Sequence, residues 1–184
     1  MRSGGDHLSR EEDPLIFVKH RGTRKNVGYE NEHTKMRKFH LIARAVILND
    51  DHVLLARQKG MGNTFIPGGH INIGESAIAA LKREIYEELG LELDVEGYLG
   101  ALEADWDDDG TEQFEMNHIF KAGIKRTSSR SPLESQEDHL EFLWSSIEDL
   151  YANNLLPHPL KKLIANYATG DRSIWWESTL VDRE

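Results

Sequence analysis

The segment from Gly69 to Leu91, GHINIGESAIAALKREIYEELGL, constrains the fold of this chain more than any other part of the sequence. Its second half is rich in good helix formers, and Ser76 is a suitable N-cap residue. Gly90 is suited to end a helix in a left-handed turn. The segment therefore predicts a loop followed by a helix from Ser76 to Leu89.

The predicted helix has one apolar and one acidic face. At about 100° per residue, four apolar side chains fall on one stripe that should face a core: Ile78, Leu81, Ile85 and Leu89. Glu84, Glu87 and Glu88 fall on a neighbouring arc because they are spaced i, i+3 and i+4. Carboxylates crowded in this way repel one another, whereas hard cations such as Mg²⁺ prefer oxygen ligands. The acidic face is either a solvated surface or a site for a divalent cation.

The spacing of the whole segment favours the cation site. Gly69, Glu75, the pair Arg83-Glu84, the pair Glu87-Glu88 and Gly90 stand at fixed offsets, and this layout resembles the Nudix box, the signature of the Nudix hydrolase family. The resemblance extends to the preceding IPGG and to the later HLEFLW and NLLPHPL, so that it covers roughly Met36 to Ala168. It implies cleavage of a nucleoside diphosphate linked to another group, with Mg²⁺ or Mn²⁺ as the cofactor.

The resemblance also implies roles for the residues of the box. Glu84, Glu87 and Glu88 are expected to be metal ligands, with Glu84 alternatively the general base, and the carbonyl of Gly69 is expected to join them. Arg83 and Glu75 are better interpreted as scaffolding, because an arginine can hold a carboxylate in bidentate geometry and so pin the loop to the helix.

Candidates outside the box are less sharply defined. The loop before the last predicted strand offers Glu137 as a general base, with Glu134, Asp138 and Glu141 nearby, but ordinary solvated loop charges have the same appearance.

Relatives often contact substrate phosphate from strand positions such as those of Arg44 and Arg57, although strand arginines more often point into solvent. Trp106 either stacks on a base or covers the core. The histidines show no metal-ligand spacing, and His70 is expected to lie in a loop.

Hydrophobic patterning predicts an α+β fold. The runs His40 to Leu48 and His52 to Arg57 form a predicted hairpin, and Thr64 to Pro67 a short strand. The remaining elements, in chain order, are strands Leu93 to Asp105 and Glu112 to Ile124 joined by the turn Trp106 to Gly110, strand Leu140 to Trp144, and helices Ser146 to Ala152 and Pro159 to Ala168. Such an order predicts a mixed β-sheet between helices, and the resemblance implies the α/β/α sandwich of the Nudix fold.

Length and composition bound the remaining possibilities. The 184 residues suit one domain, and the absence of cysteine excludes disulfides and thiolate metal sites. Because neither a membrane-spanning run nor a signal-peptide core is visible, a cytoplasmic protein without membrane partners is expected. Residues 1–35 are expected to be a leader that is partly disordered or precedes a natural start at Met36, and residues 36–184 are expected to form the Nudix domain.

The charge balance argues against long nucleic acids as partners. The formal net charge is −10, and residues 1–38 hold 9 of the 22 basic but only 6 of the 32 acidic side chains. The acidic remainder is poorly suited to neutralising a polynucleotide backbone, whereas bound cations would bridge a small nucleotide to carboxylates.

Three function classes therefore remain. The favoured one is a metal-dependent hydrolase of a phosphoanhydride bond in a nucleotide or nucleotide derivative. The alternatives are a catalytically silent nucleotide-sensing module and a purely structural acidic helix. Trp106 to Asp109 lack the proline or tyrosine that marks the ADP-ribose and dinucleoside polyphosphate subgroups, so the sequence selects no substrate. A homodimer is possible by analogy with many relatives.

Overall fold

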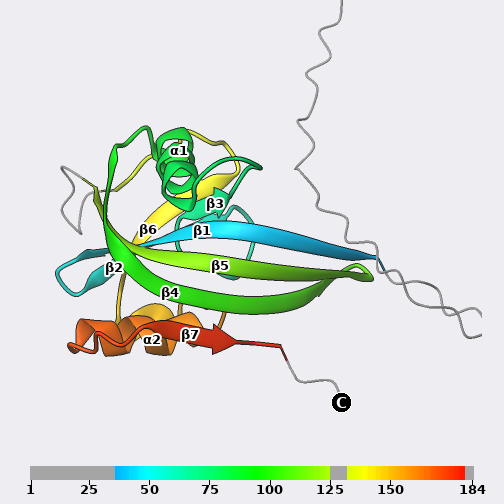
Figure 1. The fold of residues 1–184 in the computed structure, drawn as a ribbon. Coiled ribbons are helices and arrows are strands. Elements are labelled where there is room, and N and C mark those ends of the chain that lie inside the picture. The colour runs from blue at the N-terminus through cyan, green and yellow to red at the C-terminus, as the bar shows by residue number, and fades with distance from the viewer. Residues whose placement is uncertain (1–35, 125–131, 181–184) are drawn as a thin grey trace, which may run out of the picture.

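The fold consists of a mixed β-sheet with one α-helix on each side. A computed structural model describes residues 36–124 and 132–180 of the chain. The leader predicted for residues 1–35 lies outside the described residues. In Figure 1, α1 (Ala77–Leu89) lies on one side of the sheet and α2 (Pro159–Ala168) on the other. The predicted α+β class and the layered architecture are confirmed.

The sheet has seven strands, listed here with their bounds: β1 (Arg37–Asn49), β2 (His52–Gln58), β3 (Gly68–His70), β4 (Leu93–Asp108), β5 (Thr111–Ile124), β6 (Leu140–Ser146) and β7 (Trp175–Ser178). Their order is β6-β2-β1-β5-β4-β7, and β3 pairs with β1 beside this path. β1 runs parallel to β5, and β4 runs parallel to β7, whereas the other pairs are antiparallel. The sheet is therefore mixed, as expected.

Alternation along the central strands divides the core into two halves, because successive strand residues point to opposite faces. On the α1 side, Ala43 and Ala45 of β1 pack with Leu81 and Ile85 of the helix. On the α2 side, the core residues include Val46, Leu102, Ile119, Leu160 and Ile164. Each helix thus closes one apolar face of the same sheet.

The loop and helix of the box form as predicted. The Ser76 side chain accepts a hydrogen bond from the backbone N–H of Ala79, and Gly90 ends the helix with φ of 66°. Leu81, Ile85 and Leu89 are buried, but Ile78 is 45% exposed, so its predicted place in the core is wrong. Side chains lean toward the N-terminus of a helix, and that of Ile78, in the first turn, extends past the packed part.

Other predicted boundaries also change. The predicted strand Thr64 to Pro67 makes only isolated bridges, and the regular pairing begins at Gly68. β4 continues to Asp108, so the hairpin turn shrinks to Asp109 and Gly110, both with positive φ, which suits a two-residue turn. Instead of a helix from Ser146 to Ala152 there is a single 3₁₀ turn, η1 (Glu148–Leu150).

Candidate active site

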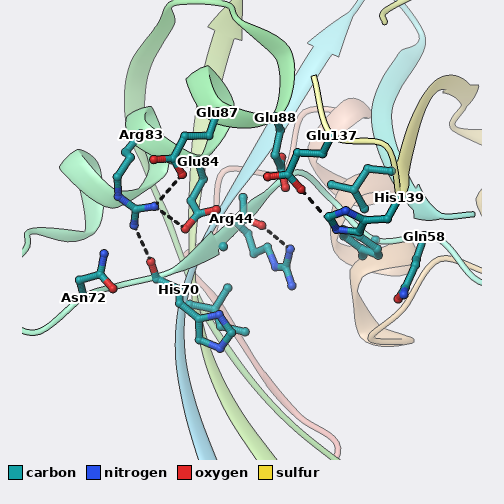
Figure 2. Close-up of a pocket in the computed structure, with 15 residues that line it drawn as sticks. Arg44, Gln58, His70, Asn72, Arg83, Glu84, Glu87, Glu88, Glu137 and His139 are labelled. Carbon is teal, nitrogen blue, oxygen red and sulfur yellow. Dashed lines mark hydrogen bonds and ion pairs between the residues drawn. The ribbon is translucent and has the colours of Figure 1, made fainter. Parts of the chain in front are cut away.

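The acidic face of α1 opens into a cleft of about 890 Å³, which we call the carboxylate cleft. Its lining comes from β1, the end of β2, β3 with its flanking segments, α1, and the loop before β6 with the first residue of β6. The lining residues are Ile42, Arg44, Gln58, Phe65, Gly68, Gly69, His70, Asn72, Arg83, Glu84, Glu87, Glu88, Glu137, His139 and Leu140. Figure 2 shows the three helical glutamates, Arg44 and Glu137 gathered around it. The structure therefore brings residues far apart in the sequence to one place.

Arg83 is the hub of the hydrogen bonds on the helix side of the cleft. Its Nε and Nη2 donate to the two carboxylate oxygens of Glu75 at 3.0 and 2.9 Å. Nη2 also donates to the carbonyl of His70 at 3.0 Å, and Nη1 donates to Glu84 at 2.7 Å and Glu87 at 3.1 Å. The predicted bidentate pair of Arg83 and Glu75 is present, and it ties the loop to the helix.

These contacts shift the pKa values of the groups involved. The hydrogen bond from Arg83 holds the pKa of Glu75 below its usual range, and its carboxylate partners raise the pKa of Arg83. Burial raises the pKa of Glu84, although the Arg83 hydrogen bond opposes the shift. The Arg83–Glu75 pair is therefore charged over a wide pH range, whereas Glu84 has a raised pKa.

Glu88 occupies the deepest position among the three glutamates. It is 6% exposed, and its Oε2 is buried without a hydrogen-bond partner among the described residues. Burial raises the pKa of Glu88 to about 8, helped by the negative charges of Glu84 and Glu137 and opposed by Arg44. A buried carboxylate oxygen without a donor is costly unless a cation or a proton satisfies it.

Gly69 lies against the helix without a side chain between them. A Cβ built at this position would collide with the carboxylate of Glu84. The lack of a side chain therefore leaves space for the carboxylate beside the Gly69 backbone, which is what the predicted role of the Gly69 carbonyl requires.

The donor set fits a divalent cation, although the described side chains do not form a closed cage. Glu84, Glu87, Glu88 and the Gly69 carbonyl offer only oxygen, as hard cations prefer, and Glu88 supplies an unsatisfied atom. Within residues 36–124 and 132–180, no three His, Asp or Glu side chains are grouped closely enough to hold a metal. Arg83 Nη1 donates to one oxygen each of Glu84 and Glu87, which leaves the second oxygen of each carboxylate for a cation. A bound cation would have to draw these side chains closer together than they lie here.

The loop before β6 places Glu137 beside Glu88. The N–H of Gln136 donates to the carbonyl of Glu88 at 2.7 Å, which anchors the loop to the end of α1. Glu137 lines the cleft and forms an ion pair with His139 at 3.3 Å, whereas Glu134 and Asp138 are exposed outside its lining. Of the predicted base candidates in this loop, Glu137 is the one that lines the cleft.

The strand arginines differ in their surroundings. Arg44 lines the cleft, its Nη1 donates to the carbonyls of Gly68 at 2.7 Å and Ile66 at 3.2 Å, and its guanidinium lies 5.1 Å from the centroid of the Phe65 ring. Arg57 does not line the cleft and instead pairs with Glu141 at 3.3 Å. The two positions predicted together thus have different environments, and only Arg44 faces the carboxylates.

His70 and Trp106 show what sequence patterns miss. His70 belongs to β3 rather than to a loop, and its Nε2 lies 2.8 Å from Nδ1 of His40. Trp106 lies in β4 and lines a second cleft on the α2 side, stacked against His40 with ring centroids 5.9 Å apart. The pairing of β1 with β3 and β5, and of β5 with β4, brings these rings together, and neither residue has a local signature.

Comparisons with known proteins agree with this arrangement. The family model described as the NUDIX domain matches residues 38–167. The human protein named 8-oxo-dGDP phosphatase NUDT18 is 30% identical over 148 residues, which cover 75% of this chain and 36% of that protein. Low-salt glycan biosynthesis protein Agl8 of Haloferax volcanii is 30% identical over 97 residues, which cover 51% of this chain and 62% of that protein. The matched part thus spans about one to two thirds of these relatives.

Solved structures support the fold. The MutT protein from Bacillus halodurans superimposes with a TM-score of 0.60 at 20% identity, covering 79% of this chain and 93% of that one. At this identity the similarity concerns the architecture alone.

No helix among the described residues is long and apolar enough to cross a bilayer.

Proposed function

This chain belongs to the Nudix family, and we propose that it is a metal-dependent hydrolase that cleaves the phosphoanhydride bond of a nucleoside diphosphate linked to another group. The observation that carries the proposal is the buried, unsatisfied Oε2 of Glu88 among the carboxylates of the cleft. A purely structural helix face has no reason to bury such an atom, because burial without a partner is costly.

In this proposal Glu84, Glu87, Glu88 and the Gly69 carbonyl hold Mg²⁺ or Mn²⁺. The bound ion supplies neutralisation of the diphosphate charge and a lowered pKa for the attacking water. Arg44 offers a positive charge to a substrate phosphate, on the wall of the cleft that faces the glutamates. This charge acts across the cleft, because it lowers the pKa of Glu84 and of Glu88. The acidic cleft thereby becomes suited to an anionic substrate.

Glu137 is proposed as the general base, and Glu84 remains the alternative. Glu137 reaches the cleft from outside α1, and it is close enough to Glu88 to raise its pKa. A base has to lie within hydrogen-bond reach of the water it deprotonates. Arg83 and Glu75 act only as positioning residues, because they fix the backbone of the loop and the carboxylates of Glu84 and Glu87.

The experiment that tests the proposal is a substrate screen with purified protein. Nucleoside di- and triphosphates, 8-oxo-dGDP, nucleotide sugars, ADP-ribose and dinucleoside polyphosphates are each incubated with Mg²⁺, Mn²⁺ or a chelator. We expect a nucleotide product to form only with a divalent ion. Binding without turnover of any substrate would favour the nucleotide-sensing alternative instead.

The cytoplasmic location, the domain bounds 36–184 and a homodimer remain predictions.

A further inference from the structure

A second cleft of about 600 Å³ lies on the α2 side of the sheet and is separate from the acidic face of α1. Its floor consists of apolar residues of the α2-side core, among them Leu102, Ile119 and Leu160, and Trp106 stands at its wall. Arg44 and Phe65 line both this cleft and the carboxylate cleft. A ligand that filled the second cleft would therefore reach the carboxylates past Arg44.

Glu115 is the unusual residue in this apolar cleft. It is 8% exposed, and it has no hydrogen bond or ion pair with any residue that the structure describes. On the same strand Glu112, 9% exposed, forms an ion pair with Arg37 at 2.7 Å. Its carboxylate oxygens are not among the buried side-chain atoms that lack a partner, so they are open to the cleft although most of the residue is covered. They can therefore accept hydrogen bonds from a ligand with N–H donors.

Asn117 adds a second acceptor beside Glu115. The two residues are two positions apart in β5 and so point to the same face of the sheet. Asn117 is 3% exposed, its Nδ2 donates to the carbonyl of Leu102 at 3.4 Å, and its Oδ1 receives no donor from the described residues. The floor of the cleft thus presents carboxylate and amide oxygens side by side.

His158 lies at another part of the lining. Its Nδ1 lies 3.1 Å from Nζ of Lys161, which is 5% exposed. This contact leaves Nε2 of the His158 imidazole for a ligand. Besides the acceptors of Glu115 and Asn117, the lining of the cleft therefore holds donors on Arg44, Asn63 and Trp106.

We propose that the second cleft holds a nucleobase and that Glu115 and Asn117 select a guanine-type ring, an inference that rests on the proposed nucleotide hydrolase function. Guanine carries two adjacent donors, the ring N1–H and the exocyclic 2-amino group, which one carboxylate can accept together. Adenine and cytosine place a ring nitrogen acceptor beside their amino group, and uracil flanks its N–H with carbonyls. These bases would direct lone pairs at Glu115, which costs affinity.

The aromatic residues suit the faces of such a ring. Trp106 is 46% exposed at the wall of the cleft, and Phe65 lies where the two clefts meet. Stacking on aromatic side chains accepts any base, so the choice among bases falls to the polar atoms. 8-Oxoguanine retains both donors of guanine and is expected to bind in the same way.

The test measures binding of nucleoside monophosphates to the full chain by calorimetry with a chelator present, so that neither metal nor turnover is required. We expect GMP to bind at least about tenfold more tightly than AMP, CMP or UMP, the ratio that one net hydrogen bond supplies. IMP, which lacks the 2-amino group, should bind more weakly than GMP, and 1-methyl-GMP should not compete. Equal affinities for all these ligands would overturn the inference without any mutant.

Variants then locate the selectivity. Glu115→Gln should abolish the preference for GMP over AMP, whereas Glu92→Gln, at an exposed position, should leave it unchanged. A Glu115→Gln protein that folds and still prefers GMP would refute the role of Glu115. Hydrolysis of nucleotides with no base preference would refute the inference but leave the proposed function standing. Selective GMP binding without hydrolysis of any nucleotide would support the inference about the base but contradict the proposed hydrolase function.

Discussion

Arg83 holds both carboxylate oxygens of Glu75, with its Nε and Nη2 donating at 3.0 and 2.9 Å. The same guanidinium donates through Nη1 to Glu84 and Glu87. One side chain therefore fixes the loop to the helix and also sets the directions of two proposed metal ligands. Only the planar fork of an arginine can make these contacts together, because a lysine has a single nitrogen.

Arg83→Lys is expected to lower kcat/KM about 100-fold, because displacing reacting groups by about 1 Å can cost that factor. The folded structure should persist, since the apolar stripe of α1 remains buried. Steady-state kinetics and a thermal melt measure the two effects. The control is Lys82→Gln, at the exposed neighbouring position, which should behave as wild type. Full activity of Arg83→Lys would show that the fork is dispensable.

Glu88→Gln is expected to lower kcat about 100- to 1,000-fold, the range seen when one electrostatic stabiliser of a transition state is removed. Since burial already disfavours the charge of Glu88, the metal-free variant should be at least as stable as wild type at pH 9. Kinetics and denaturant unfolding of the same preparation measure both quantities. Glu92→Gln, an exposed carboxylate just beyond α1, is the control. Loss of folding in Glu88→Gln would contradict this account of the buried charge.

Gly69→Ala is expected to weaken metal binding and activity, because the new Cβ would collide with the carboxylate of Glu84. Gly97→Ala is the matched control, since no atom lies within 4 Å of a Cβ built at that position. Metal titration of the two variants compares them directly. Equal metal affinity of Gly69→Ala and wild type would mean that Glu84 is not required close to the Gly69 backbone.

Glu137→Gln is expected to reduce kcat with little change in KM, because a general base acts on the attacking water rather than on the bound ground state. Glu134→Gln, in the same loop but outside the lining of the cleft, should leave kcat unchanged. If both variants keep wild-type kinetics, Glu84 becomes the candidate base.

Much of the fold was predictable because local signals and tertiary packing agree. The capping residues Ser76 and Gly90 mark the ends of α1 correctly, and the α2 bounds match the prediction. β7 was missed since its four residues are a strand only through parallel pairing with β4. The extent of β4 was underestimated because Trp106 to Asp108 read as turn residues, yet their pairing with Thr111 to Gln113 extends the hairpin.

The site was predictable where its residues are close in sequence. Arg83 and its glutamate partners belong to one loop and one helix, so spacing alone indicates their contacts. Glu115 and Asn117 gave no such signal, because an alternating polar pattern in a strand is also typical of a solvated face. Only the structure shows that this face is buried beneath a cleft.

The raised pKa of Glu88 predicts that the proposed metal binding depends on pH. The carboxyl of Glu88 has a pKa of 4.5 in the unfolded chain and about 8 in the folded protein. Its contribution to the free energy of unfolding is therefore most favourable below pH 4.5, where it is protonated in both states, and is lost as the pH rises through 8. A cation requires the ionised form and competes with the proton, so metal affinity should rise and proton release should fall between pH 6 and pH 9.

Calorimetric titration of the full chain with Mn²⁺ at pH 6 and pH 9, in buffers of different ionisation enthalpy, tests the central claim most directly. The account predicts stoichiometric uptake that is tighter at pH 9, with protons released at pH 6, and both features lost in Glu88→Gln. Absence of any uptake by the wild-type protein at both pH values, even with a non-hydrolysable nucleoside triphosphate analogue present, would contradict it.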